Sequence, residues 1–428
     1  MAENLSGLRV MVVGDGGREH ALIWKLAQSP LVGRVYAVPG NAGTAQEPKT
    51  TPYLVSPDHK SIVAATKARA IDLVVIGPEA PLADGLADAL DDANILVLGP
   101  KKLGAALEAS KVFAKDFMTR HGIPTAPYAH FSEFQAAEEY IRSCPLPVVI
   151  KADGLSRGKG TAIARTAEEA FQAARKKLAQ GRIVVEKFLD GEEATYTCLV
   201  AGGAALPFPS SQDHKRLLEQ DRGPMTGGMG PYAPAPGVDA AMEERVYEEI
   251  VLPLLRGLEV EMISYTGFLY IGLMIMDGRP YVLEFNCRLG DPEAQALLMR
   301  FEGDLATLLF RAARGKLESS LLAWDPRPAI CVVLAAAGYP NEPRKRDVIA
   351  GLEEAQTLPD VKVFHAGTEY SGGKVVTAGG RVLGVTAMGN SVGQAREIAY
   401  SAIKKISFPG MHYRRDIGHR AVAREMAQ

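Results

Sequence analysis

The chain has 428 residues, with 47% hydrophobic and 23% charged residues, which is the composition of an ordinary globular protein of two to four structural units. Its formal net charge of −2 excludes a global attraction to nucleic acid or to an anionic membrane. No apolar run approaches the roughly 18 residues that span a bilayer, and the first residues do not resemble a signal peptide. The four cysteines lie far apart without metal-ligand spacing, which predicts reduced thiols in a cytoplasmic protein.

Short apolar runs alternate with helix-compatible segments in the first part of the chain. Residues 8–13 form one such run, and RVYAVPG, DLVVIGP and ILVLGP contain three more that end in Gly or Gly-Pro. Strands that alternate with helices are typical of a parallel sheet with crossover helices. We therefore expect a parallel, doubly wound sheet over residues 1–105.

The first of these runs ends in a glycine-rich turn, GDGGREH. A dinucleotide-binding fingerprint, G-x-G-x-x-G, would require a third glycine where the chain has Glu19. Gly14, Gly16 and Gly17 can still bring the backbone close to a ligand just before a helix N-terminus, which favours an anion. A purely structural turn fits this motif equally well.

A second glycine-rich stretch, KADGLSRGKG, covers residues 151–160. A helix with Phe113 and Phe117 one turn apart is predicted from Ser110 to His121, and residues 147–153 and 160–164 read as strands. The glycine-rich loop thus joins two strands, whereas a Walker A loop opens a helix. Such a hairpin can fold over phosphates as a flap, with Arg157 or Lys159 available to their oxygens.

The second half of the chain combines strands with polar loops. Residues 182–200 read as strand, turn, strand, and residues 265–293 contain two strands joined by an Asp277-Gly278 turn. Between them, residues 210–234 are long, polar and rich in Gly and Pro, which is typical of a functional or disordered loop. A further unit begins after Asp325-Pro326 with an apolar strand.

The most informative local pattern is Glu284-Phe285-Asn286 at the end of a predicted strand. Residues two apart on a strand share a face, so a carboxylate and an amide oxygen converge there. Hard oxygen ligands suit Mg²⁺, which is usually held by few protein groups together with nucleotide phosphates. Arg288 follows on the same face, and Asp291 comes soon after it. A surface strand with a salt bridge is the alternative for this stretch alone.

The motifs together carry a family resemblance. Lys111, the KADG…GKG loop, EKFLDGEE and EFNCRLGDPE occur in an order that resembles the ATP-grasp superfamily. More narrowly, the chain resembles the glycinamide ribonucleotide synthetase family nearly from end to end. The motifs that carry this narrower resemblance are VVGDGGREHAL, PGNAGT, GPEAPL, SQDHKR, TGGMGPYAPAP, TGFLYIGLM, EFNCRLGDPEAQ and HAGT.

The resemblance implies a fold in three parts. These are an N-terminal substrate-binding domain (1–105), an ATP-grasp α+β core (106–324) with a mobile flap subdomain near residues 123–190, and a small C-terminal α/β domain (325–428). It also implies a reaction in which ATP phosphorylates glycine to glycyl phosphate, which the amine of 5-phosphoribosylamine then attacks in purine biosynthesis. We expect a monomer that binds small molecules, with no nucleic acid or membrane partner.

The resemblance assigns roles residue by residue. ATP would be bound by Lys111, Lys151, Gly154, Gly158, Lys159, Gly160, Glu186, Phe188, Leu189 and Glu193. Mg²⁺ or Mn²⁺ would be held by Glu284 and Asn286. The residues expected around glycine and the acyl phosphate are Asp213, Lys215, Arg288 and Asp291. Those expected to face phosphoribosylamine are Gly16, Gly17, Asn41, Gly43, Thr44, Pro78 and Glu79.

Two departures from the family pattern and two alternatives accompany these assignments. The segment KKLAQGRIVVEKFL is short, and YIGLMI lacks the additional acidic metal ligand of many ATP-grasp enzymes, so Glu284 and Asn286 must supply the protein's share. Another ATP-grasp ligase, of the biotin-carboxylase or carboxyaminoimidazole type, would share the ATP residues but lack SQDHKR, TGGMG and RLGDPEAQ. A nucleotide-binding regulatory protein without catalysis would have lost metal ligands or lysines, and all of these are present.

Overall fold

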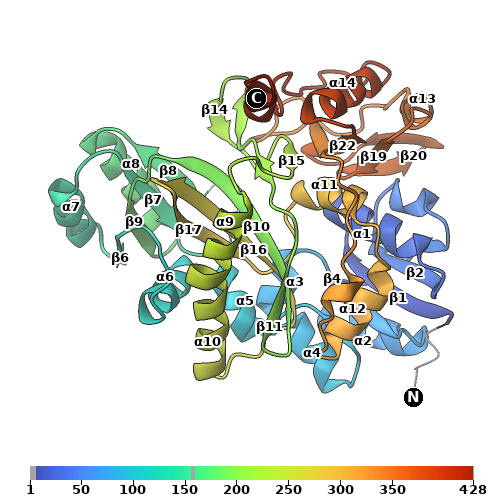
Figure 1. Ribbon diagram of the computed structural model, residues 1–428, viewed down its shortest axis with the longest axis horizontal. Helices are drawn as coiled ribbons and strands as arrows, with labels where there is room; N and C mark the ends of the chain where they lie inside the picture. Colours follow the sequence, from blue (N-terminus) through green and yellow to red (C-terminus); the bar gives the residue numbers. More distant parts are fainter. Residues whose placement is uncertain (1–5, 156–159, 428) are drawn as a thin grey trace.

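The computed structural model describes residues 6–155 and 160–427. Figure 1 shows a blue N-terminal unit, a central unit with a small sheet projecting to one side, and a red C-terminal unit above the N-terminal one. In the described ranges no helix combines the length and apolar character needed to cross a membrane. All four cysteines are free thiols; three are buried and Cys144 is partly exposed.

The N-terminal unit is built on a sheet with the order β3-β2-β1-β4-β5, in which every neighbouring pair is parallel. Its elements are β1 (Leu8–Gly14), α1 (Gly17–Gln28), β2 (Val32–Pro39), a 3₁₀ turn (Thr44–Gln46), β3 (Thr50–Pro52), α2 (His59–Ala68), β4 (Leu73–Ile76), α3 (Glu79–Asp84), α4 (Leu86–Asp92) and β5 (Val97–Leu98). Val10 and Val12 pack with Leu22 of α1 on one face, and Met11 and Val13 pack with helices on the other. The expected doubly wound sheet is confirmed.

The strand order of this sheet reverses between β1 and β4. In open α/β sheets, ligands bind beyond the carboxyl ends of the strands at such a reversal. The loops that follow β1 and β4 contain the glycine-rich turn and Pro78-Glu79. The fold therefore brings two predicted substrate-binding segments to one edge of the sheet.

The central unit contains two antiparallel sheets. The larger has the order β11-β10-β16-β17. Its strands and associated helices are α5 (Lys102–Ala109), α6 (Lys111–Arg120), β10 (Glu192–Ala201), β11 (Ala204–Pro207), α9 (Ala240–Val246), a π-helical turn (Tyr247–Val251), α10 (Leu252–Val260), β16 (Gly267–Met276), β17 (Arg279–Asn286), α12 (Leu305–Ala313) and a 3₁₀ turn (Ser319–Leu321). Helices α6, α9 and α10 cover one apolar face of this sheet. The β16–β17 hairpin turns at Asp277 and Gly278, which have φ values of 51° and 70°.

The smaller sheet projects from the central unit, at the left of Figure 1, with the order β6-β9-β7-β8. Its elements are β6 (Tyr128–Phe131), α7 (Phe134–Ser143), β7 (Val148–Ala152), β8 (Thr161–Ala164), α8 (Ala167–Leu178) and β9 (Ile183–Lys187). Residues of α7 and α8 pack on its strands in one apolar cluster. β7 and β8 pair antiparallel, so the loop at 153–160 joins two strands, as predicted.

The C-terminal unit has a sheet with the order β12-β15-β18-β22-β19. Its elements are β12 (Gln212–Asp213), β13 (Arg216–Leu218), β14 (Arg222–Met225), β15 (Pro231–Ala233), α11 (Glu293–Arg300), β18 (Ala329–Ala335), α13 (Leu352–Gln356), β19 (Val361–His365), β20 (Thr368–Ser371), β21 (Lys374–Thr377), β22 (Arg381–Met388), α14 (Val392–Ile403) and α15 (His419–Glu425). Residues 210–234, expected as an irregular loop, form the β13–β14 hairpin and two strands of the C-terminal sheet, β12 at its edge and β15 inside it. The reason is non-local, because β15 pairs with β18 nearly a hundred residues later.

Helix α11 lies where the three units meet. It packs against α1 of the N-terminal unit and against β15, β18 and β22 of the C-terminal sheet (Figure 1). The helix begins just after the turn formed by residues 287–292, which itself follows β17. The segment with the highest density of predicted site residues is thus held by all three units.

Candidate active site

Lys151 and Glu186 form a buried ion pair on neighbouring strands of the smaller sheet. Lys151 lies on β7 and donates from Nζ to Glu186 Oε2 and to the Leu283 carbonyl, each at 3.0 Å. The two residues are only 6% and 3% exposed. The pair therefore connects the smaller sheet to β17, which carries the candidate metal ligands.

Lys115 also contacts Glu186, and it was not among the residues predicted from the sequence. Its Nζ lies 3.0 Å from Glu186 Oε2 and donates to Thr125 Oγ1 at 2.7 Å. Burial lowers the pKa of Lys115 to about 8, although Glu186 acts in the opposite direction. The sequence does contain a pattern that places Lys115 near the site, because Lys111 and Lys115 are four residues apart and share one face of the predicted helix.

Lys111 is the first residue of α6 and closes on the glycine-rich loop. Its Nζ donates to the Gly154 carbonyl at 2.9 Å, and burial lowers its pKa. Asp153 positions the helix end by accepting from Ser110 Oγ at 3.0 Å. Gly154 has φ of +106°, and the Gly160 carbonyl accepts from the Ala152 N–H at 2.9 Å, so both glycines border the loop. Gly158 and Lys159 lie outside the described residues.

Glu284 and Asn286 converge as their spacing predicts. Asn286 Nδ2 donates to Glu284 Oε1 at 3.4 Å. Although desolvation acts to raise it, the pKa of Glu284 is held below its ordinary value by Lys151, Lys111 and Lys215. Gly272 lies opposite Glu284 on β16, so no side chain occupies the position where a further acidic ligand would stand. The carboxylate and the amide are the oxygen donors that Mg²⁺ prefers.

A small apolar cluster formed by Ala126, Leu189 and Met274 joins the two central sheets near these charges. Leu189 is 5% exposed and packs against Ala126 and Met274, while Phe188 is half-buried. Glu193, at the start of β10, has its pKa raised by burial and by the nearby Glu284 carboxylate, against the attraction of Lys215. These residues place apolar surface and a carboxylate next to the lysine cluster.

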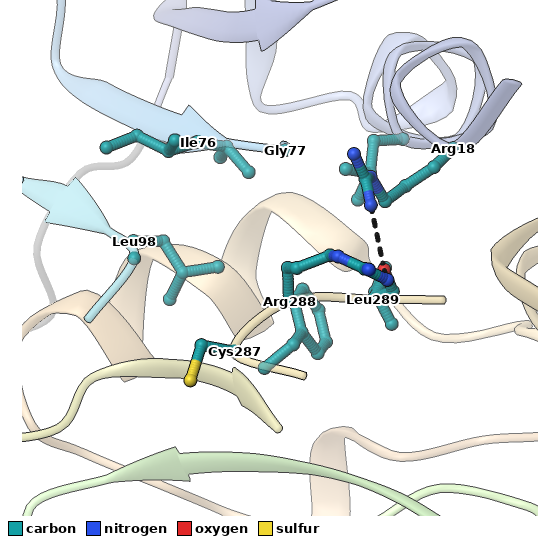
Figure 2. A pocket seen from close by; sticks show the side chains of 11 residues that line it. Arg18, Ile76, Gly77, Leu98, Cys287, Arg288 and Leu289 are labelled. Atoms are coloured by element: carbon teal, nitrogen blue, oxygen red, sulfur yellow. Dashed lines mark hydrogen bonds between the residues drawn. The ribbon is translucent and has the colours of Figure 1, made fainter. Parts of the chain in front are cut away.

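Arg288 extends from the candidate metal ligands to the N-terminal unit. Its Nη2 donates to Asn286 Oδ1 at 3.1 Å and to Glu108 Oε1 at 2.9 Å, and its Nε lies 3.3 Å from Glu79 Oε2. Figure 2 shows Arg288 in a pocket between the ends of β4 and β5 and the turn that follows β17, with Arg18 on the opposite side. Arg288 is therefore the side chain that bridges the predicted metal and substrate regions.

Lys215 lies between two buried carboxylates. Its Nζ is 2.7 Å from Asp213 Oδ2 and 3.2 Å from Glu293 Oε1, and both carboxylate side chains are 1% exposed. Against the opposing effect of desolvation, these carboxylates raise the pKa of Lys215 well above its ordinary value. Asp213 and Lys215 are predicted site residues, whereas the sequence alone indicates no role for Glu293.

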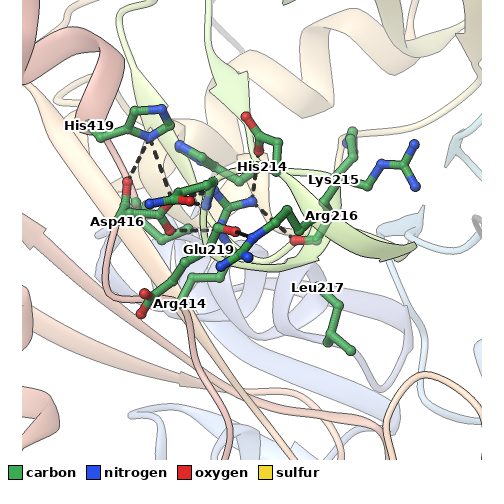
Figure 3. Close-up of polar contacts among 12 residues, drawn as sticks. His214, Lys215, Arg216, Leu217, Glu219, Arg414, Asp416 and His419 are labelled. Carbon is green, nitrogen blue, oxygen red and sulfur yellow. Dashed lines mark hydrogen bonds and ion pairs between the residues drawn. The ribbon is translucent and has the colours of Figure 1, made fainter.

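The C-terminal segment fixes β13, the strand that begins directly after Lys215. Arg414 is fully buried, pairs with Asp221 at 2.9 Å and Asp416 at 2.8 Å, and donates to the Arg216 carbonyl at 3.1 Å. Figure 3 shows this network directly beside His214 and Lys215. The position of Lys215 thus depends on residues two hundred positions later in the chain.

The glycine-rich turn after β1 contains its own anion. Glu19 accepts from the Gly16 N–H at 2.7 Å and from Arg18 Nε at 2.6 Å, and it is 1% exposed. Glu19 stands where the dinucleotide-binding fingerprint has its third glycine. Its carboxylate therefore bonds the Gly16 N–H that was expected to face a ligand. Asp291 faces the same turn, since a Cβ added to Gly16 would lie 3.0 Å from its Oδ2.

Asn41 organises the loop after β2. Its Oδ1 accepts from the N–H groups of Gly43 and Thr44, each at 3.0 Å, and its Nδ2 donates to the carbonyls of Asp15 and His365 at 2.8 and 2.9 Å. Thr44 is fully buried. The structure gives these residues an internal role that links the N-terminal and C-terminal units, and their contact with a ligand stays a prediction.

Known proteins resemble this chain over nearly its whole length. Family models of phosphoribosylglycinamide synthetase match consecutively: the N domain at residues 8–108, the ATP-grasp (A) domain at 109–294 and the C domain at 329–420. The chain belongs to the phosphoribosylglycinamide synthetase family. The match also decides between the alternatives raised from the sequence, because all three domain models describe this one family.

Individual members of the phosphoribosylglycinamide synthetase family are similar over the whole chain. The phosphoribosylamine–glycine ligase of Vibrio parahaemolyticus is 50% identical, covering 98% of this chain and 99% of its own. The crystal structure of the Thermotoga maritima phosphoribosylamine–glycine ligase has a TM-score of 0.81 at 37% identity, covering 96% of this chain and 100% of its own. Biotin carboxylase of Campylobacter jejuni, with a TM-score of 0.72 at 14% identity over 95% and 92% of the two chains, shares the fold.

His214, which precedes Lys215, predicts a loss of stability at acidic pH. Its Nδ1 bonds the Gly230 carbonyl and its Nε2 accepts from the Gly418 N–H, so the ring is held neutral, and burial lowers its pKa to about 4. Between about 4 and 6.5 the unfolded chain binds the proton and the folded chain does not, so stability falls with falling pH. Urea unfolding should show a loss of about 2 kcal/mol from this residue between about pH 7.5 and pH 5.

The matched variant for this prediction is His214→Gln, which has no titratable ring. Its free energy of unfolding should depend less on pH over the same interval than that of the wild type, even if the variant is less stable at neutral pH. An unchanged pH slope in the variant would contradict the assignment.

Proposed function

We propose that the protein ligates glycine to 5-phosphoribosylamine with ATP, giving glycinamide ribonucleotide, ADP and phosphate in purine biosynthesis. The observation that carries the proposal is the consecutive match of all three family domains, with relatives named phosphoribosylamine–glycine ligase near 50% identity over full length.

The proposed reaction has two steps. A glycine carboxylate oxygen bonds to the γ-phosphorus of ATP as the bond to ADP breaks, giving glycyl phosphate. The amine of phosphoribosylamine then forms the C–N bond, phosphate leaves with the C–O electron pair, and the nitrogen loses a proton. No protein nucleophile is required, so the protein contributes mainly positioning and charge stabilisation.

The nucleotide would lie between the two central sheets. Lys111 and Lys151 would contact its phosphates, with the loop bounded by Gly154 and Gly160 folding over them, and Gly158 and Lys159 contributing from that loop. Phe188 and Leu189 would border adenine, and Leu189 packs in an apolar cluster with Ala126 and Met274. Glu186 would meet the base while Lys115 and Lys151 hold its carboxylate. Glu193 would accept from the ribose hydroxyls.

Glu284 and Asn286 fit a divalent cation, Mg²⁺ or Mn²⁺. Within residues 6–155 and 160–427 no cluster of three or more His, Cys, Asp or Glu residues could hold a metal. The remaining ligands would therefore come from nucleotide phosphates and water. Bound there, the cation would neutralise charge on the transferred phosphoryl group, while Arg288 would face that group from the other side.

The remaining predicted residues divide into two groups. Asp213, Lys215 and Asp291 would surround glycine and the acyl phosphate. The residues that would border phosphoribosylamine are Gly16, Gly17, Asn41, Gly43, Thr44, Pro78 and Glu79. Support for this division comes from the edge of the parallel sheet, where the loops after β1 and β4 meet Arg288 and Asp291.

The test is a product assay with purified protein, ATP, Mg²⁺, glycine and freshly generated phosphoribosylamine. We expect ADP and glycinamide ribonucleotide in equal amounts, each dependent on both glycine and the amine. Turnover that is indifferent to glycine would overturn the proposal.

The proposed function also includes a division into domains, an oligomeric state and a cellular location. The chain would divide into units at 1–105, 106–324 and 325–428, with the flap near 123–190, although β12 and β15 cross into the sheet of the third unit. The protein would act as a monomer. It would work in the cytoplasm, for which the four free thiols are the supporting feature.

A further inference from the structure

Arg381 is a residue of the C-terminal unit that reaches two loops of the site. It is the first residue of β22, and its Nη1 donates to the Gly227 carbonyl and to the Asp291 carbonyl, each at 2.6 Å. Its Nη2 lies 3.5 Å from the Asp291 carboxylate. One guanidinium therefore ties together two segments that are 64 residues apart in the sequence.

Each of these segments supports a charged group of the site. The Gly227–Gly230 turn packs on Asp213: the Gly230 N–H donates to Asp213 Oδ1 at 3.1 Å, and a Cβ added to Gly228 would lie 2.3 Å from Asp213 Oδ2. The other segment carries Asp291, whose carboxylate faces Gly16 and Gly17. A shift of the guanidinium would move both Asp213, with its partner Lys215, and Asp291.

The surroundings of Arg381 keep the guanidinium in place. Tyr339 Oη accepts from the Gly227 N–H at 3.2 Å, and a Cβ added to Gly380 would meet the Tyr339 ring at 2.5 Å. Asp291 is held from its other side by Gln295 Nε2 at 3.1 Å. Hydrogen bonds from a charged donor to carbonyls are among the stronger ones in proteins, so they hold the Arg381 guanidinium in one position.

We propose that Arg381 is a positioning residue through which the C-terminal unit aligns Asp213 and Asp291 for capture of the acyl phosphate by the amine. The hydrogen bonds of Arg381 described above go to Gly227 and Asp291, and none of them goes to the lysines around Glu186. We therefore expect the affinity for ATP to be independent of Arg381. This inference rests on the proposed ligase function, and it assigns the C-terminal unit a part in the ligation step.

The experiment compares Arg381→Ala with wild type in steady-state kinetics and in the ratio of ADP to glycinamide ribonucleotide. We expect KM for glycine and for phosphoribosylamine to rise about 10- to 100-fold, as for loss of one or two charged hydrogen bonds. The KM for ATP should stay within about twofold. The product ratio should exceed one, because glycyl phosphate that waits for a misplaced amine is hydrolysed by water to glycine and phosphate.

Controls separate positioning from folding. Arg344→Ala removes an arginine of the same unit that bonds Asp347 at 2.7 Å and the Pro409 carbonyl at 2.8 Å, and it should leave all four quantities unchanged. Millimolar guanidinium should partly restore the product ratio of Arg381→Ala, which it would not do for a merely unstable protein. Tyr339→Phe is a milder variant that should shift the same quantities in the same direction.

The outcomes also separate the inference from the function on which it rests. If wild type makes no glycinamide ribonucleotide, the proposed function fails. If wild type is active and folded Arg381→Ala keeps wild-type KM values and an equal product ratio, the inference fails alone. A rise in KM for ATP as large as that for glycine would also overturn it.

Discussion

Replacement of Glu284 by alanine should lower the turnover number by about 10²- to 10³-fold or more, the cost of removing a group that stabilises transition-state charge. Glu284 is the one carboxylate of the candidate metal pair, and the opposite position on β16 is Gly272, which cannot substitute for it. The loss should appear in kcat at saturating ATP, together with a higher Mg²⁺ concentration for half-maximal rate.

The fold of the Glu284→Ala variant should be intact, because the Glu284 side chain is exposed. Glu369→Ala is the matched control, since Glu369 is an exposed carboxylate on β20 in the C-terminal unit. It should leave both turnover and Mg²⁺ dependence unchanged. Near-normal turnover of Glu284→Ala would contradict the metal role.

Replacement of Lys215 by methionine should abolish most turnover and destabilise the protein by about 3–5 kcal/mol at neutral pH. The reason is that Asp213 and Glu293 would be left buried without the cation that lies between them, and breaking a buried pair by removing one partner is strongly destabilising. Chemical denaturation of the variant and wild type measures the difference.

The penalty in Lys215→Met should shrink toward acidic pH. Without the lysine, the folded-state pKa values of the two carboxyls rise above their unfolded values, so the folded state binds more protons than the unfolded state in that window. Stability of the variant relative to wild type therefore falls as pH rises through it. Lys316→Met, at an exposed lysine, should show no such dependence, and a penalty that is constant with pH would be inconsistent with unpaired carboxylates.

Local patterns predicted the elements whose causes are local. The parallel strands follow from apolar runs that end in glycine, and the β16–β17 hairpin follows from Asp277-Gly278, whose positive φ values such a turn requires. The convergence of Glu284 and Asn286 follows from the two-residue period of a strand. The register of β16 and β17 shifts between Gly272 and Leu273, but Glu284 and Asn286 both lie on the regular side of that shift and keep the two-residue period.

Features with non-local causes escaped the sequence. Within residues 210–234, β15 becomes an inner strand because it pairs with β18, and Asn41 bonds His365 across 324 positions. In the sequence, Glu19 only replaces the third glycine of a motif. The spacing of the motif does not predict that its side chain folds back to bond the Gly16 N–H. Lys115 was missed for a different reason, since its helical spacing from Lys111 was visible but pointed to no chemistry without Glu186.

The inward-facing carboxylate of Glu19 makes the turn after β1 preorganised. Because the Gly16 N–H and Arg18 already bond the buried Glu19 carboxylate, the turn has its shape without a ligand, and binding there would involve little loss of conformational entropy.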